Sequence, residues 1–155
     1  MYPSTGMELA YREALLAYET GDVPIGCVII YRDEVIGRGR NRRNELKNVL
    51  CHAELLAIGE ACAFMGDWRL EDCDVYVTVE PCPMCAGALL QARVRRLFFG
   101  AKNPKAGAVG SVVDLLGTDG FNHWVEVVSG VMEQECRELM QKFFRERRTT
   151  PEPSA

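Results

Sequence analysis

Several features are missing from this sequence, and each absence narrows what the chain can be. No apolar run reaches the ~18 residues that a membrane-spanning helix needs. Residues 1–19 lack both a basic leader and a long apolar stretch, so they do not have the form of a secretory signal peptide. Internal repeats and low-complexity segments are absent as well. We therefore expect a cytoplasmic globular protein that has no membrane partner.

A disulfide framework is not expected either, although the chain has seven cysteines. Because the cytoplasm keeps thiols reduced, cysteines there are more often buried or bound to metal. A strong net charge is also absent, and the formal value of −4 gives no indication of nucleic-acid binding. Basic residues are nevertheless concentrated at 38–47, 93–105 and 142–148. Such local patches can bind a polyanion, and solvated surface is the alternative interpretation.

The hydrophobic patterns predict one α/β domain over residues 1–148, followed by a flexible tail over 149–155. Two β-rich runs, 24–31 and 34–41, are joined by Arg-Asp, which predicts a hairpin. Beyond the hairpin, helical and strand patterns alternate, so we expect a central mixed sheet of five strands between two layers of helices. Helices are expected over 7–21, 52–66, 83–93 and 131–148, and the remaining strands over 73–80, 94–100 and 123–130.

The segment Pro-Cys-Pro-Met-Cys, residues 81–85, raises the question of what its cysteines do. They could form a disulfide, half of a structural zinc site, a redox pair or part of a catalytic metal centre. Cys82 and Cys85 lie at an expected helix start, where the helix dipole favours thiolate, the form that binds zinc. His52 supplies an imidazole from another expected helix start. Three protein ligands favour a catalytic zinc, because a structural site normally has four.

Two neighbours of His52 bear on this site. Cys51 is the one rival for the fourth ligand position, but adjacent side chains project in different directions, so burial beside the site is preferred. Glu54 could ligate zinc or, at a helix tip, reach a water molecule at the metal as a proton shuttle. The alternative for Glu54 is an acid that complements the helix dipole.

The pairing of His-Ala-Glu with Pro-Cys-Pro-Met-Cys about thirty residues later resembles the H-x-E…P-C-x-x-C signature of zinc-dependent nucleobase deaminases. The similarity to bacterial tRNA-specific adenosine deaminases extends over roughly residues 7–148, through DVPIGCVI, GRGRN, HAEL and YVTVEPCPMCAGALLQARVRRLFFGAKNPKAGAVGS. This resemblance implies the cytidine-deaminase-like fold and one zinc ion per subunit, held by His52, Cys82 and Cys85. It also implies that the chain converts adenosine to inosine at wobble position 34 of a tRNA, an arginine tRNA in particular, with Glu54 as general acid and base.

Further roles follow only from this resemblance. Asn41 hydrogen-bonds the target base, Val23 and Pro24 form an apolar wall, and Ala53 and Glu80 contribute backbone groups around the base. Contacts to the anticodon stem-loop are implied for Lys105, Phe144, Arg145 and Arg148. His123 helps to shape the pocket for the anticodon loop. The resemblance also implies a homodimer.

The chain departs from the family at Cys51, where many members have Ala or Gly, and at Asn103, where many have Asp. Because Asn103 lacks the negative charge of the usual Asp, the substitution could change how the site binds the target ribose and how it discriminates between RNA and DNA. Two other functions stay open. A deaminase of guanine or of a cytidine compound is disfavoured by the basic segments 102–105 and 143–148. A zinc-containing RNA-binding domain without catalysis is disfavoured by Glu54 and by the three-ligand site.

Overall fold

The computed structural model describes residues 1–149, with side chains described as far as Arg147. Residues 150–155 of the expected tail lie outside the described part, and Thr149 ends the last helix. None of the helices within residues 1–149 combines the length and apolar character that a bilayer crossing requires. The elements are α1 (Pro3–Glu19), β1 (Gly26–Tyr31), β2 (Glu34–Arg40), α2 (Arg43–Leu46), α3 (Ala53–Met65), β3 (Asp74–Val79), α4 (Pro83–Ala92), β4 (Arg96–Ala101), β5 (Glu126–Val128) and α5 (Glu133–Thr149).

The five strands form one mixed sheet in the order β2-β1-β3-β4-β5. Strand β1 is antiparallel to both β2 and β3, whereas β3, β4 and β5 run parallel to one another. The hairpin predicted at Arg-Asp is confirmed. Arg32 and Asp33 have φ values of 49° and 63°, as in the two-residue turns that match the twist of paired strands.

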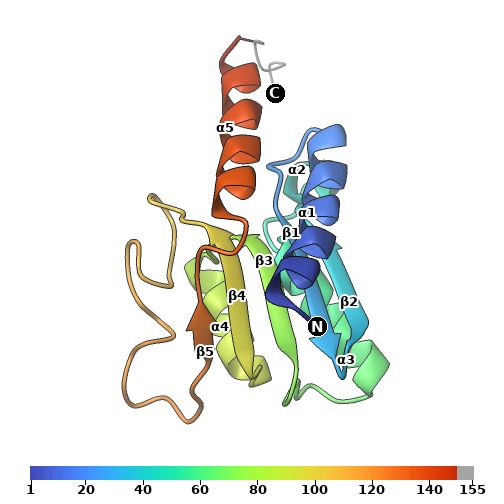
Figure 1. The fold of residues 1–155 in the computed structure, drawn as a ribbon, viewed down its shortest axis with the longest axis vertical. Helices are drawn as coiled ribbons and strands as arrows, with labels where there is room; N and C mark the ends of the chain where they lie inside the picture. Colours follow the sequence, from blue (N-terminus) through green and yellow to red (C-terminus); the bar gives the residue numbers. More distant parts are fainter. Residues whose placement is uncertain (150–155) are drawn as a thin grey trace.

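Helices cover both faces of the sheet, so the predicted three-layer α/β/α fold is confirmed (Figure 1). Side chains alternate along the strands between two apolar clusters. On β1, Val28 and Ile30 face the cluster that includes α1 and α5, whereas Cys27 and Ile29 face the cluster that includes α3 and α4. Both faces of β1 and β3 are buried, so apolar residues in these strands occupy consecutive positions as well as alternate ones.

Two glycines of β2 let α3 lie directly against the sheet. A Cβ atom at Gly39 would stand 2.1 Å from the Ala53 carbonyl oxygen, and one at Gly37 would stand 2.4 Å from that of Ala57. Any side chain at these positions would push the helix outward. The glycines therefore fix the height of the α3 N-terminus above the sheet, where His52 precedes the helix.

The structure differs from the expected elements in two connections. The polar segment after β2 contains the short helix α2, which the sequence pattern does not show. The segment 102–125 joins two parallel strands without a helix, and within it only an isolated bridge between Val109 and Asp114 is regular. Because β5 is parallel to β4, this segment must return along the whole length of the sheet before β5 begins.

Candidate active site

Two helix starts meet at one end of the sheet and bring together the predicted metal ligands. His52 is the residue before α3, with extended backbone angles, and Cys82 stands in the equivalent place before α4. Pro83 occupies the first position of α4, where its missing N–H costs nothing, and Cys85 follows within the first turn. The fold therefore places one imidazole and two sulfurs beside two helix N-termini, as the sequence predicts. These three side chains, His52, Cys82 and Cys85, are called the metal cluster below.

The geometry of these three donors fits a tetrahedral zinc ion. The Nδ1 atom of His52 lies 3.6 Å from Sγ of Cys82 and 3.5 Å from Sγ of Cys85, and all three donor atoms lie within 4.8 Å of one another. Zinc bonds of about 2.3 Å to sulfur and about 2.0–2.1 Å to nitrogen, at a tetrahedral angle, separate N and S by about 3.6 Å. The two N···S distances agree with that value, so Nδ1 is the ring nitrogen placed to bind a metal ion.

Among the described residues, no fourth His, Cys, Asp or Glu side chain joins this group. Cys51 is buried but lies outside the cluster, in agreement with its expected place beside the site. The other free cysteines lie outside it as well, namely Cys27, Cys62, Cys73 and Cys136. Three donors leave one tetrahedral position for a water molecule or a substrate, which is the pattern of catalytic zinc.

The charges of the cluster are already arranged for a cation. A hydrogen bond from the Cys85 thiol, together with His52, lowers the pKa of Cys82 to about 4. The hydrogen bond to Cys82 in turn raises the pKa of His52. The hydrogen bond with Cys82 and burial raise the pKa of Cys85. One thiolate is therefore stabilised next to two groups that release their protons when a metal binds.

Glu54 is the second residue of α3 and is almost completely buried, with 4% of its surface exposed. Burial, and secondarily the negative charge of Cys82, raises the pKa of Glu54 to about 7. The nearby Cys85 thiol and the charge of His52 oppose this rise in pKa without cancelling it. A carboxyl group beside a metal cluster that can both accept and release a proton near neutral pH has the properties of a general acid and base.

Asn41, Val23 and Pro24 lie together beside the cluster. The Asn41 side-chain Nδ2 donates to the Val23 carbonyl oxygen at 3.3 Å, and Asn41 is only 6% exposed. The backbone N–H of Arg42 donates to the Cys51 carbonyl at 2.9 Å, so the segment after β2 runs alongside the residue before His52. Ala53, fully buried, completes this side. The residues expected to bind the base therefore lie on a segment that is hydrogen-bonded to the segment carrying His52.

Glu80 has a role that the sequence does not reveal. Its side chain is 2% exposed, and its carboxylate accepts backbone N–H groups from Asn103 at 3.2 Å, Val109 at 2.9 Å and Ser111 at 3.0 Å, and also the Ser111 hydroxyl. Burial opposes ionisation of Glu80, but these hydrogen bonds outweigh it and lower the pKa. Glu80 thus holds down the loop that carries Asn103 and the exposed Lys105.

Three of the remaining expected residues, Phe144, Arg145 and Arg148, lie on α5. The outer half of α5 carries Phe144 and Arg145, and Arg147 from the same turn donates a hydrogen bond to the Gly21 carbonyl, two residues before Val23. The basic end of α5 is therefore fastened near the expected base pocket. The side chain of Arg148 lies outside the described residues.

His123 lies at the end of the sheet away from His52, Cys82 and Cys85, and its expected part in shaping the anticodon pocket stays a prediction. Its Nε2 lies 2.8 Å from the Val94 carbonyl oxygen, just before β4 begins, whereas the metal cluster lies beyond the ends of β3 and β4. His123 is at the opposite end of the sheet because segment 102–125 has already returned there to enter β5. The sequence resemblance places His123 in a motif but cannot show this return path.

The family of MafB19-like deaminases matches residues 4–148 of this chain. A tRNA-specific adenosine deaminase of Bacillus subtilis strain 168 is 49% identical over 142 residues, which is 92% of this chain and 88% of that protein. A solved structure from a study of A-to-I editing by tRNA deaminases at the wobble position is 46% identical, with a TM-score of 0.84 over 87% of this chain and 98% of its own. A guanine deaminase structure from Bacillus subtilis is 25% identical, with a TM-score of 0.64 over 100% of this chain and 99% of its own.

Proposed function

We infer the reaction from one premise: this chain belongs to the MafB19-like deaminases and, among them, to the tRNA-specific adenosine deaminases. It is a hydrolytic deaminase that acts on adenosine in tRNA. The finer proposal is that it converts adenosine to inosine at wobble position 34 of the anticodon, in an arginine tRNA first of all. One observation carries the proposal: His52 Nδ1 lies within 3.6 Å of the sulfurs of Cys82 and Cys85, and the buried carboxyl group of Glu54 is two residues from His52.

His52, Cys82 and Cys85 hold one zinc ion per subunit in this proposal. Bound zinc supplies a water molecule that is acidic enough to act as a nucleophile near neutral pH. The proposal is supported by the two N···S distances, both of which fit tetrahedral zinc.

Glu54 moves the protons of the reaction. Its carboxylate accepts a proton from the attacking water and delivers it to N1 of the adenine ring, which makes C6 electrophilic. Glu54 then takes the second proton of that water molecule from the oxygen now bound to C6. As the C6–N bond breaks, Glu54 passes this proton to the departing amino group, which leaves as ammonia. Water is consumed, and inosine and ammonia are formed. The burial of Glu54 supports this role, because its carboxyl is shielded from competing solvent protons.

The base enters the pocket between Asn41 and the wall formed by Val23 and Pro24. Asn41 uses one N–H and one lone pair of its amide within the protein. The second N–H and the second lone pair stay available for hydrogen bonds to the edge of the purine. An anticodon loop suits this pocket, because its bases are already partly unstacked and cost little to flip out.

The RNA backbone is held by the loop that Glu80 anchors and by the end of α5. Lys105 and Asn103 lie on that loop, and Phe144, Arg145 and Arg148 lie on α5. Binding through such basic residues makes affinity fall as salt rises. Membership of the family also supports a homodimer as the working form.

Guanine deamination is the second candidate, favoured by the likeness to a guanine deaminase structure over the whole chain. One assay separates the candidates. The protein is incubated separately with an arginine tRNA that carries adenosine at position 34, with free guanine and with cytidine, and ammonia and inosine are measured. We expect release from the tRNA alone, with about one zinc per chain by metal analysis. Release from guanine alone would favour the second candidate, and no release from any substrate would favour an RNA-binding domain.

A further inference from the structure

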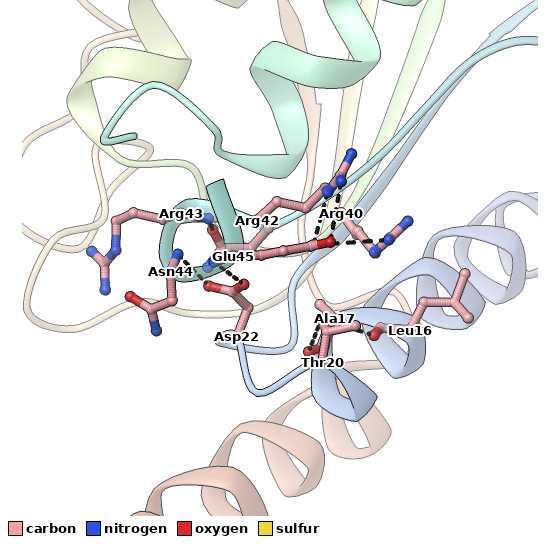
Figure 2. A network of polar contacts seen from close by, with 10 residues as sticks. Leu16, Ala17, Thr20, Asp22, Arg40, Arg42, Arg43, Asn44 and Glu45 are labelled. Carbon is pink, nitrogen blue, oxygen red and sulfur yellow. Dashed lines mark hydrogen bonds and ion pairs between the residues drawn. The ribbon is translucent and has the colours of Figure 1, made fainter. Parts of the chain in front are cut away.

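Asp22, in the connection between α1 and β1, is a fully buried acid that lies outside the metal cluster. Its Oδ1 accepts the backbone N–H of Asn44 at 2.8 Å, and its Oδ2 accepts that of Glu45 at 3.1 Å (Figure 2). Both donors belong to α2, more than twenty residues further along the chain. A buried carboxylate is costly unless such hydrogen bonds compensate for its lost hydration, so these contacts hold Asp22 firmly in place.

The short helix α2 depends on Asp22 and Asn41 for its start. The first N–H groups of a helix have no acceptor within the helix, and Arg42, the residue before α2, provides no side-chain cap. The N–H of Arg43 goes to the Asn41 side-chain oxygen at 3.2 Å, and the next two N–H groups go to Asp22. Asp22 and Asn41 therefore cap the same helix from two different segments.

The same contacts join the two segments that flank the target base in the proposed function. Asn41 donates from its side chain to the Val23 carbonyl and from its backbone to the Ile25 carbonyl, at 3.3 and 3.0 Å. Segment 22–25 and segment 41–45 are thus connected side by side, with the Asp22 carboxylate at one end of the connection. The orientation of the Asn41 amide is fixed by two partners, one on each segment, so it changes if the segments move apart.

Glu45 shows what a neighbouring acid does when it has no such role. Its carboxylate points outward, and it pairs with Arg42 through bonds of 2.9 and 3.2 Å on the exposed side of α2 (Figure 2). It accepts no backbone N–H of segment 22–25. Glu45 and Asp22 therefore offer a matched pair of carboxylates, one on the surface and one inside.

We propose that Asp22 is a positioning residue: its carboxylate fixes α2 against segment 22–25 and thereby orients the Asn41 amide toward the target base. The proposal rests on the proposed function, in which Asn41 binds that base. Asp22 itself touches neither the substrate nor the metal ligands. Because small displacements of a positioning group lower the rate steeply, the effect of its loss is expected in catalysis more than in metal binding.

The primary variant is Asp22→Asn, which keeps the volume of the side chain but turns one oxygen into an N–H donor facing a backbone donor. We expect kcat/KM for the tRNA substrate to fall by about 10- to 100-fold with zinc content unchanged. Asp22→Ser is made in parallel, because it retains one acceptor oxygen and adds no bulk. Glu45→Gln is the surface control and is expected to stay within about twofold of the unaltered protein.

A double-mutant cycle distinguishes positioning from simple loss of stability. If Asp22 acts through Asn41, then Asp22→Asn adds little to the loss caused by Asn41→Ala, and the double variant resembles Asn41→Ala alone. A purely structural role would give losses that multiply. Amide hydrogen exchange provides a readout independent of activity: protection at Asn44 and Glu45 should fall at least about tenfold in Asp22→Asn.

The outcomes are separable. An unaltered protein that makes no inosine in tRNA overturns the proposed function and the role of Asp22 with it. An active protein in which Asp22→Asn and Asp22→Ser both retain kcat/KM within about twofold overturns the role of Asp22 alone, and so do losses that multiply with Asn41→Ala. If Asp22→Asn does not fold, the same criteria are applied to Asp22→Ser.

Discussion

The two ends of the sheet use acidic side chains in different ways. At the end that carries the metal cluster, Asp22 and Glu80 are buried, and they bind backbone N–H groups of α2 and of the loop after β4, respectively. At the opposite end, Asp74 binds two arginine side chains, each through two hydrogen bonds of 2.6 to 3.1 Å. A carboxylate that binds backbone fixes the course of a loop, whereas one that binds guanidinium groups joins two strands. We infer that the carboxylates bound to backbone keep the candidate active site in shape, whereas the carboxylate bound to arginines stabilises the fold.

The largest effect is expected at Glu54. Glu54→Gln keeps the shape of the side chain but removes its ability to accept a proton, so turnover should fall by at least about 1,000-fold while zinc is retained. Inosine formation under single-turnover conditions and metal analysis measure the two quantities. A variant that loses zinc along with activity would show that Glu54 helps to hold the metal, and the loss of turnover could then not be assigned to proton transfer.

A smaller but still catalytic effect is expected at Glu80. Glu80→Gln places an N–H donor among three backbone N–H groups, so the loop carrying Asn103 and Lys105 should loosen. We expect kcat/KM for tRNA to fall by about 10-fold, mostly through a higher KM. Kinetics at two salt concentrations test this, since weaker loop contacts also reduce the salt dependence of binding. An unchanged KM would mean that the loop does not hold the RNA.

Asp74→Asn should affect stability and leave activity within about twofold. Removing a charged partner from two arginines costs about 1–2 kcal/mol, because both arginines are partly exposed and can regain water. Urea unfolding and the rate of inosine formation measure the two quantities. A loss of activity larger than the loss of folded protein would contradict the division between the two ends.

The same substitution has a signature in acid. Burial opposes ionisation of Asp74, but Arg96 and Arg95 outweigh it and lower the pKa in the folded state. The unfolded chain then binds more protons, so the stability due to Asp74 is present above a pH of about 3.9 and is lost as pH falls below it. The difference in melting temperature between the unaltered protein and Asp74→Asn should therefore narrow between about pH 6 and pH 3.

The smallest effect is expected at His123. His123→Gln removes a hydrogen bond to the Val94 carbonyl at the end distant from the cluster. Activity on tRNA should change by less than about twofold, and the melting temperature should fall slightly. A loss of tenfold or more would show that the anticodon stem extends to this end, and the comparison between the two ends would need to be redrawn.

The fold could be predicted from sequence because its signals are local. The apolar runs of β1 and β3, the Arg-Asp turn and Gly66 at the end of α3 each indicate one element. The candidate metal ligands could also be predicted, since His52 and Cys82 each precede a helix and their residue types are those that bind zinc. Helix α2 could not be found in this way, because its first N–H groups are satisfied by Asp22 from a distant part of the chain.

The roles of Asp22 and Glu80 share this origin. Each carboxylate binds backbone N–H groups that lie 22 to 31 residues further along the chain, so no local pattern marks it. The position of His123 in the fold could not be predicted for a related reason, because the motif around it is local but the path of segment 102–125 is not. Sequence therefore identifies the groups that perform chemistry more readily than the groups that hold them in position.

The turn between β1 and β2 offers a practical use of this arrangement. Arg32 and Asp33 both adopt positive φ angles, which non-glycine residues other than Asn, Asp and His rarely adopt, so the strain falls on Arg32. The turn lies at the Asp74 end of β3, because Ile30 pairs with Asp74. Exchanging the two residues for Asn-Gly would therefore relax the backbone at the end of the sheet away from His52, Cys82 and Cys85, and an enzyme engineer could raise the melting temperature there without altering those residues.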